Sequence, residues 1–385
     1  YETCSAAGLN LKALRTSLKH HNSGLSKNNL PGSDLDTWIG HVEQVSNVND
    51  LGRWQSRNNA LAALGYEQGT IRQTVAGLIS KYGAARVGLV MGSSTSSIDC
   101  TEAAYTQLDE SGNLTEQFKQ PFVHNPHAPS LFMAHLTGIT GPSLTINTAC
   151  SSSAKVFATG ARWLETGIVD AVLVGGVDTL CLSVLHGFNS LQLLSPNPCK
   201  PFDQHRDGIN LGEASGFAVL QRPGENSNSS GISLTGYGES SDAYHMSHPH
   251  PDGLGARLSM TQALERANRE AAEIDYINLH GTSSRANDLI EGQLISELFP
   301  GTTQCSSTKA WMGHTLGAAG ITEAIIAMDT LNTNIIPGSK NLETLDEALS
   351  LSIKASDEHK VCQHVMTNSF GFGGNNCTLL FSRSE

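Results

Sequence analysis

Charged residues are scarce in this sequence: Asp, Glu, Lys and Arg make up 16% of its 385 residues, against about 25% in a typical globular chain. Few charges indicate a chain with much interior or interface surface. Hydrophobic residues at 39%, together with 38 glycines, exclude a disordered chain. Basic residues number 24 against 36 acidic ones, and the resulting net charge of −12 offers no general attraction for nucleic acid or anionic lipid.

Membrane and export signals are also missing. No window approaches the ~18 unbroken apolar residues of a membrane span, and the N-terminus lacks a basic-then-apolar signal pattern. We therefore expect a cytoplasmic protein with no nucleic-acid or membrane partner.

The eight cysteines contain no CxxC pair, so the sequence predicts neither a disulfide framework nor a zinc site. At most one of them is expected to have a chemical role, because most free cysteines are buried and inert. Three histidines cluster in the segment AYHMSHPHPDG, but its prolines and glycine predict a loop. We expect no metal.

Extended and helical patterns alternate along the chain, as in an α/β protein. A helix is predicted over 256–272 from apolar residues on one face at 3.6-residue spacing. Several predicted strands are continuously apolar, which suits strands covered on both faces. The predicted strands are 85–92, 143–148, 170–178, 216–222, 232–238, 276–281, 363–369 and 377–383.

A linker-like stretch, RPGENSNSSG at 222–231, divides the chain into halves 1–223 and 231–385. Each half ends in a pair of strands and contains a strand that runs into a Gly/Ser-rich turn, which suggests a duplicated βαβ unit. The first residues lead almost directly into a helical pattern, so we expect an initial strand to be missing from the start of this sequence.

The first chemistry-bearing segment is SLTINTACSSSAKVFATGARWLETG (143–167), in which a strand runs into a serine-rich turn and a helix. Cys150 lies at that junction, where the helix N-terminus favours a thiolate and its N–H groups can stabilise an oxyanion. A small buried cysteine is the alternative, so Cys150 needs partners to count as a nucleophile.

Three further segments supply possible partners. His280 follows a predicted strand in YINLHGTSSRANDLIEG, at the strand end where α/β sheets place their sites. Lys309 and His314 lie in SSTKAWMGHTLGAAGITEAI, and a buried Lys309 would need an acidic partner, for which Glu323 is the candidate. The glycines of NSFGFGGNN (368–376) allow a tight turn close to a ligand.

In this order the segments resemble the motifs of β-ketoacyl-acyl-carrier-protein synthases, the elongating condensing enzymes of fatty acid and polyketide synthesis, over essentially the whole chain. The resemblance implies a thiolase-like fold, with two similar βαβ-rich halves in a five-layered αβαβα arrangement. The sequence departs from the family at Asn375, at Ala310–Met312 and at Arg285–Ala286. These departures leave the catalytic groups intact and concern acyl or carrier specificity.

The resemblance also implies roles for the residues. Cys150 takes an acyl group from a carrier thioester without a dedicated base, and His280 and His314 stabilise the enolate formed when malonyl-carrier protein loses CO₂. Backbone N–H groups of Cys150 and Phe370 receive the tetrahedral oxyanion, and Phe370 gates malonyl access. Lys309, paired with Glu323, organises the site.

The substrates would arrive on the phosphopantetheine arm of an acyl carrier protein, so no separate cofactor is expected. By resemblance Thr282 and Ser284 bind this arm and Ser247 adds a contact, although all three could be ordinary turn residues.

Carrier proteins are acidic, so an acidic enzyme needs a local positive patch to dock one. Arg53 and Arg57 are predicted on one helical face at i, i+4, with Lys200 and Arg206 as further candidates; ordinary solvated surface is the alternative for each.

The apolar, proline-punctuated stretch 122–144 predicts a dimer whose partner helps to close the acyl tunnel. That partner is either an identical copy or a non-catalytic chain-length-factor subunit, with this chain as the active ketosynthase.

Rival functions fit less well. A degradative thiolase needs a second cysteine in a Cys-Gly-rich loop, whereas Cys377 falls in a predicted strand. An initiating synthase pairs its cysteine with His and Asn, whereas GHTLGAAG supplies a second His. A chain-length factor would lack the nucleophile.

Overall fold

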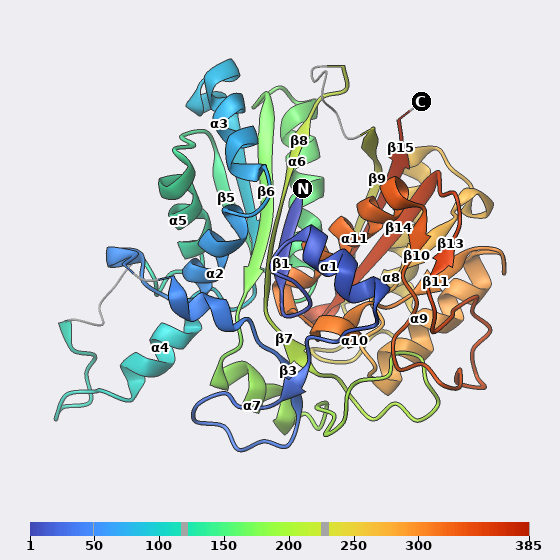
Figure 1. Ribbon diagram of the computed structural model, residues 1–385, viewed down its shortest axis with the longest axis horizontal. Helices are drawn as coiled ribbons and strands as arrows, with labels where there is room; N and C mark the ends of the chain where they lie inside the picture. Colours follow the sequence, from blue (N-terminus) through green and yellow to red (C-terminus); the bar gives the residue numbers. More distant parts are fainter. Residues whose placement is uncertain (49, 117–121, 225–230, 385) are drawn as a thin grey trace.

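The computed structural model describes residues 1–48, 50–116, 122–224 and 231–384. It contains two five-stranded sheets, and most of the predicted linker lies outside the described residues (Figure 1). In spatial order the first sheet consists of β5 (Ser143–Ile146), β4 (Val87–Gly92), β6 (Ala171–Asp178), β8 (Ala214–Gln221) and β1 (Glu2–Ser5). The second consists of β11 (Gln304–Ser306), β10 (Tyr276–Asn278), β14 (His364–Gly371), β15 (Asn375–Arg383) and β9 (Ile232–Ser241).

The two sheets share one topology, which confirms the expected duplication. In each, the third strand along the chain lies at one edge and is followed in space by the second, fourth, fifth and first. The first two pairings in this spatial order are parallel and the last two are antiparallel in both sheets.

Helices complete five layers, as Figure 1 shows. Between the sheets lie α6 (Ser152–Glu165) and α11 (Ala319–Thr333), which contact each other. The outer face of the first sheet carries α2 (Arg57–Tyr66), α3 (Ile71–Tyr82) and α5 (Ala128–Thr137). The outer face of the second carries α8 (Leu254–Ala267) and α9 (Arg285–Leu298).

The continuous apolar strands follow from this layering. In β6, Val172 and Val174 pack into the central core, whereas Leu173 packs outward against the outer helices. Both faces of the sheet are therefore buried, and each position of the strand before Asp178 is apolar or glycine. All eight predicted strands are present.

Two sequence expectations about element boundaries were wrong. The opening residues form β1 themselves, antiparallel to β8, before α1 (Leu11–Lys19) begins. The predicted helix 256–272 ends at Ala267, because Asn268 adopts a left-handed conformation with φ of 50° and closes it. The residues after it form a short 3-10 turn over Ala271–Glu273.

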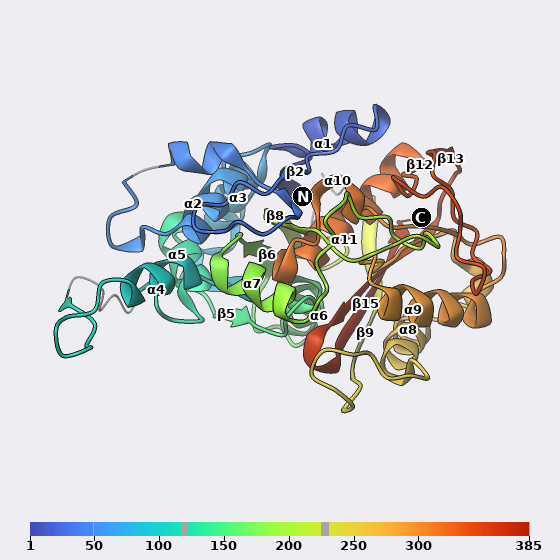
Figure 2. The ribbon, with the colours of Figure 1, turned by 90° about the horizontal axis from the view of Figure 1, so that it is seen from below.

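The remaining elements are short. Figure 2 shows α4 (Ile98–Tyr105) and the loop after it projecting from the body. No helix in the described part of the chain is long and apolar enough to cross a membrane. The others are α7 (Leu182–Ser190), α10 (Lys309–Met312), β2 (Ser26–Lys27), β3 (Trp38–Gly40), β7 (Leu211–Gly212), β12 (Ile335–Ile336) and β13 (Glu358–His359).

Candidate active site

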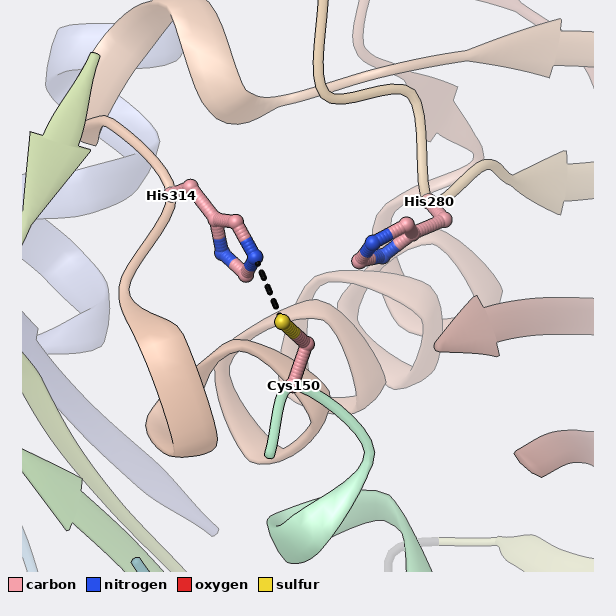
Figure 3. A group of neighbouring side chains, drawn as sticks. All are labelled: Cys150, His280 and His314. Atoms are coloured by element: carbon pink, nitrogen blue, oxygen red, sulfur yellow. Dashed lines mark hydrogen bonds between the residues drawn. The ribbon is translucent and has the colours of Figure 1, made fainter. Parts of the chain in front are cut away.

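Cys150, His280 and His314 converge between the two halves (Figure 3). Cys150 lies between β5 and α6, His280 follows β10, and His314 lies between α10 and the next short helical turn. The His314 Nε2 atom is 3.0 Å from the Cys150 sulfur, and the two imidazole rings are perpendicular with centroids 5.3 Å apart. All three side chains are buried. The fold thus brings together the three residues singled out by motif.

The backbone at Cys150 is held in an unusual turn. Ala149 adopts a φ of 51°, a left-handed conformation that is costly for a residue with a side chain. Ser152 stabilises the turn, because its hydroxyl accepts the Thr148 N–H and donates to the Ala149 carbonyl. A side chain at Gly371 would lie 2.9 Å from the Thr148 carbonyl oxygen. This close approach explains the glycine in segment 368–376, which we call the closing loop.

Burial, not the helix end, dominates the ionisation of Cys150. It raises the pKa of the thiol to about 11, although the Phe372 backbone N–H and the Lys309 charge act in the opposite direction. We expected the helix N-terminus to favour the thiolate; in the folded protein the protonated thiol prevails at neutral pH.

Both histidines are neutral. Burial, with the positive charge of Lys309, holds the pKa of His280 and of His314 well below the usual value. The Leu316 N–H donates to Nδ1 of His314 at 3.3 Å, which leaves the ring proton on Nε2, the atom that faces Cys150. Nδ1 of His280 is buried and has no hydrogen-bond partner among the described residues.

Lys309 forms the predicted pair with Glu323. Its ammonium donates to a carboxylate oxygen of Glu323 and to the backbone carbonyl of His280, and all three residues are buried. Burial raises the pKa of Glu323 to about 7 against the opposing effect of Lys309. Lys309 therefore connects α10 and α11 to the turn that carries His280.

Two buried carboxylates with structural contacts to the site were missed in the sequence. Glu291 accepts the backbone N–H groups of His280 and Gly281, each at 2.8 Å, and so fixes the His280 turn. A signal existed, since Asp288 and Glu291 lie at i, i+3 on α9, and both are buried.

The second missed carboxylate is Asp178 at the end of β6. It accepts hydrogen bonds from Ser93, Ser94 and Thr95 after β4, and from the Gly317 N–H in the segment after His314. One carboxylate of the first half thereby anchors a catalytic segment of the second. The bond partners are distant in sequence, so no local pattern points to them.

The closing loop contacts Cys150 through a different residue from the one we expected. The backbone N–H that reaches Cys150 belongs to Phe372, not to Phe370, which lies in β14 opposite Asn376. The Phe370 ring lies 6.0 Å from the His280 ring, and the Phe372 ring stacks on Phe188.

A cavity of about 370 Å³ opens at these residues. Cys150, His280 and His314 line it together with Thr282, Ser284 and Ser247, the hydroxyl residues singled out by resemblance. The Thr282 and Ser284 hydroxyls are 2.9 Å apart. Thiol, imidazoles and hydroxyls thus share one space.

Two of the four basic residues expected to dock the carrier are unsuitable. Arg57 is ion-paired with the buried Glu213, and it begins α2, whereas Arg53 lies in a separate 3-10 turn. The predicted i, i+4 helical face therefore does not exist. Arg206 is 3% exposed and pairs with Asp346 at 2.6 Å.

Of the other two, Lys200 is 28% exposed and lies 3.0 Å from Glu343. Arg53 is exposed and stacks on the Phe122 ring.

Ligand-type atoms of Cys150, His280 and His314 lie within 4.8 Å of one another, which makes them the one group of three metal-ligand residues in the described ranges. These atoms come from segments far apart in sequence. In the loop 242–252, Nδ1 of His245 lies 3.2 Å from Nδ1 of His248, without a third such ligand.

Comparison with known proteins identifies the family of this chain. The family model "Beta-ketoacyl synthase, N-terminal domain" matches residues 21–226, and the C-terminal domain model matches 232–343. The chain is 34% identical over 323 residues to 3-oxoacyl-[acyl-carrier-protein] synthase 2 of Vibrio harveyi, covering 79% of this chain and 77% of the relative.

Solved structures have the same fold. A chain of the complex of ketosynthase ApeO with its chain length factor ApeC from Xenorhabdus doucetiae superposes with a TM-score of 0.87 at 36% identity, covering 99% of this chain and 96% of that one. The ishigamide ketosynthase/chain length factor, at 22% identity and a TM-score of 0.89 over 99% and 97%, shows the fold alone. The duplicated thiolase-like fold and the two matched domains establish that this chain belongs to the β-ketoacyl synthase family.

Proposed function

We propose that this chain is a β-ketoacyl-acyl-carrier-protein synthase, which joins an acyl group to a malonyl unit with loss of CO₂. The observation that carries this proposal is a thiol and two neutral imidazoles within 4.8 Å in one cavity. The similarity to 3-oxoacyl-[acyl-carrier-protein] synthase 2 supports the same reaction class.

In the first half-reaction Cys150 attacks the carrier thioester. The thiol loses its proton, the sulfur bonds to the acyl carbon, and the carrier thiol leaves with a proton. Because the resting pKa is about 11, ionisation must accompany attack. The Nε2–H of His314, 3.0 Å from the sulfur, stabilises the charge that develops there.

In the second half-reaction malonyl-carrier protein enters. N–H groups of His280 and His314 donate to the thioester oxygen, which becomes an enolate as the carboxylate leaves as CO₂. The carbanion attacks the acyl carbon on Cys150, and the sulfur departs and regains a proton. Backbone N–H groups of Cys150 and Phe372 receive the tetrahedral oxyanion, since both act on the Cys150 sulfur in the resting site.

The supporting residues hold this geometry. Lys309 and Glu291 fix the His280 turn from opposite sides of its backbone, through the carbonyl and the N–H groups. Phe370 and Phe372 gate the cavity, and Thr282, Ser284 and Ser247 bind the phosphopantetheine arm. Every reacting group belongs to the chain or to the carrier-bound substrates, so the proposed reaction needs no metal or dissociable cofactor.

A dimer partner is part of this proposal. β5 ends the first sheet, and its outer edge is unpaired in the described residues. Leu131 and Leu136 of α5 are 38% and 36% exposed beside it, within the stretch 122–144, and Tyr105 on the projecting α4 is 64% exposed. A bare edge strand next to apolar side chains favours pairing with a second subunit.

The partner is an identical copy or a chain-length-factor-like subunit. The second is the alternative function of this chain, the active ketosynthase of a heterodimer. The 36% identity to a chain of a ketosynthase–chain length factor complex supports it. Light scattering of the chain alone tests dimerisation. Leu131→Arg should weaken the dimer, whereas Ile168→Arg, at a 47% exposed position after α6, should not.

The function is tested with a series of acyl-carrier proteins and malonyl-carrier protein. The expected result is an acyl adduct on Cys150 by intact mass and peptide mapping, and a 3-oxoacyl product when the malonyl substrate is added. If the chain needs an unlike partner, the product forms only after co-expression with it. Absence of both adduct and product under either condition contradicts the proposal.

A further inference from the structure

One basic side chain lines the cavity beside the hydroxyl residues. Arg285 is the first residue of α9, directly after Ser284, and it is exposed. It is the single Lys or Arg among the residues that line the cavity in the described chain. Cys150, 5% exposed, lies in the same cavity. The cavity thus extends from a buried thiol to a solvent-facing guanidinium.

The other charged groups of this wall are already bonded. Asp207 accepts hydrogen bonds from Ser195 and Asn197, and Asp242 accepts from the Asn376 amide at 2.8 Å. Arg285, in contrast, forms no ion pair with any carboxylate in the described ranges. Its guanidinium is therefore available to an anion from outside the chain.

The backbone of Arg285 is fixed even though its side chain is exposed. The buried guanidinium of Arg206 donates to the Arg285 carbonyl at 3.3 Å and to the Asp346 carboxylate at 2.6 Å. Asp346 is thus bonded to Arg206, and the charge of Arg285 acts on it only at longer range, without an ion pair. Arg206, which we expected to meet the carrier itself, instead holds the segment that presents Arg285.

We infer that Arg285 binds the phosphate of the phosphopantetheine arm. This inference rests on the proposed function. The arm has a thioester at one end and a phosphodiester at the other, and the cavity offers Cys150 inside and Arg285 at the exposed end. Arginine suits a phosphate because its planar fork of N–H donors matches two phosphate oxygens. The hydroxyls of Thr282 and Ser284 lie beside it on the same segment.

Ligand binding tests this without turnover. Calorimetry compares free 4′-phosphopantetheine with pantetheine, which lacks the phosphate, on the whole protein. The wild type should prefer the phosphorylated ligand, and Arg285→Gln should lose that preference, about tenfold in affinity. Arg285→Lys should retain part of it. Arg269→Gln is the control, because Arg269 is partly exposed, pairs with Glu273 and does not line the cavity.

Kinetics sharpen the assignment. With malonyl-phosphopantetheine and malonyl-carrier protein, Arg285→Gln should raise KM about tenfold at unchanged kcat. With malonyl-pantetheine it should change neither parameter. Equal phosphate preference in wild type and Arg285→Gln overturns the inference. A change of KM that is seen with malonyl-carrier protein but not with malonyl-phosphopantetheine also overturns it. A chain that distinguishes the two free ligands through Arg285 but condenses none of the malonyl substrates contradicts the proposed function and leaves the phosphate contact established.

Discussion

The two halves place different chemistry at the same position of a shared topology. β5 and β11 are each the third strand of their half and each an edge strand. The turn after β5 carries Cys150, and the turn after β11 leads to Lys309. One turn presents a thiol to the cavity; the other buries a cation against Glu323 and the His280 carbonyl. Duplication has thus provided one reacting junction and one supporting junction.

The edges of the two sheets differ as well. β11 is covered, because the Cys305 N–H donates to the Ser352 carbonyl at 2.8 Å and Cys305 bridges to Ile353. β5 has no such cover in the described chain. The half that carries the nucleophile therefore keeps its edge open to a partner, whereas the half that carries both histidines closes its own.

The largest expected effect comes from the turn after β5, which carries Cys150. Cys150→Ala should abolish the acyl adduct and all condensation, because Cys150 is the one cysteine that lines the cavity in the described chain. Intact mass after incubation with acyl-carrier protein measures it. Cys100→Ala is the control, since Cys100 lies on α4 and does not line the cavity. An adduct that persists in Cys150→Ala would assign the nucleophile to another residue.

Removing Lys309 should disturb the geometry of the site without removing a reacting group. Lys309→Ala leaves Glu323 buried without its cation, which typically costs about 3–5 kcal/mol of stability. Thermal unfolding should show this loss, and the fraction that folds should still acylate Cys150 slowly. Complete loss of acylation in a folded Lys309→Ala protein would mean that Lys309 takes part in the acylation itself. The turns after β5 and β11 would then no longer differ in role.

The next largest effect concerns the two second-half histidines. His280→Ala and His314→Ala should each lower malonyl decarboxylation by ~10²–10³, the usual loss for one donor to a developing oxyanion. Cys150→Ala should retain decarboxylation, because the enolate is held by the second half. Release of CO₂ from malonyl-carrier protein measures all three variants. Normal decarboxylation in either histidine variant contradicts their assigned role.

The burial of Cys150 predicts a pH dependence. With a pKa of about 11, the thiolate fraction rises about tenfold per pH unit up to that value, so alkylation by iodoacetamide should accelerate without a plateau between about pH 7 and about pH 9. Mass spectrometry of the Cys150 peptide follows the rate, with Cys150→Ala as the blank. A plateau near neutral pH would show that the helix end outweighs burial.

The sequence predicts strands and motifs well because each depends on local patterns. β6 reads as a strand from its apolar run, and Cys150 and His280 stand at recognisable strand ends. It fails where the outcome depends on contacts between distant segments. Arg57 and Arg206 look like surface cations until Glu213 and Asp346, more than a hundred positions away, pair with them. The ionisation of Cys150 and the choice of Phe372 over Phe370 likewise depend on packing.

The smallest expected effect concerns carrier docking to the first half. Arg53 is exposed, and its guanidinium lies over the Phe122 ring, 4.2 Å from the centroid, which leaves its charge available to an acidic carrier. Exposed ion pairs contribute ~0.2–1 kcal/mol, so Arg53→Glu should raise KM for the carrier substrate about two- to threefold at low salt and less at high salt. Steady-state kinetics at two ionic strengths measure it, with Arg72→Glu as the control on α3. Arg53→Glu should change KM for the carrier protein alone, whereas Arg285→Gln should also change KM for malonyl-phosphopantetheine. Salt-independent kinetics for Arg53→Glu would remove Arg53 from the docking surface.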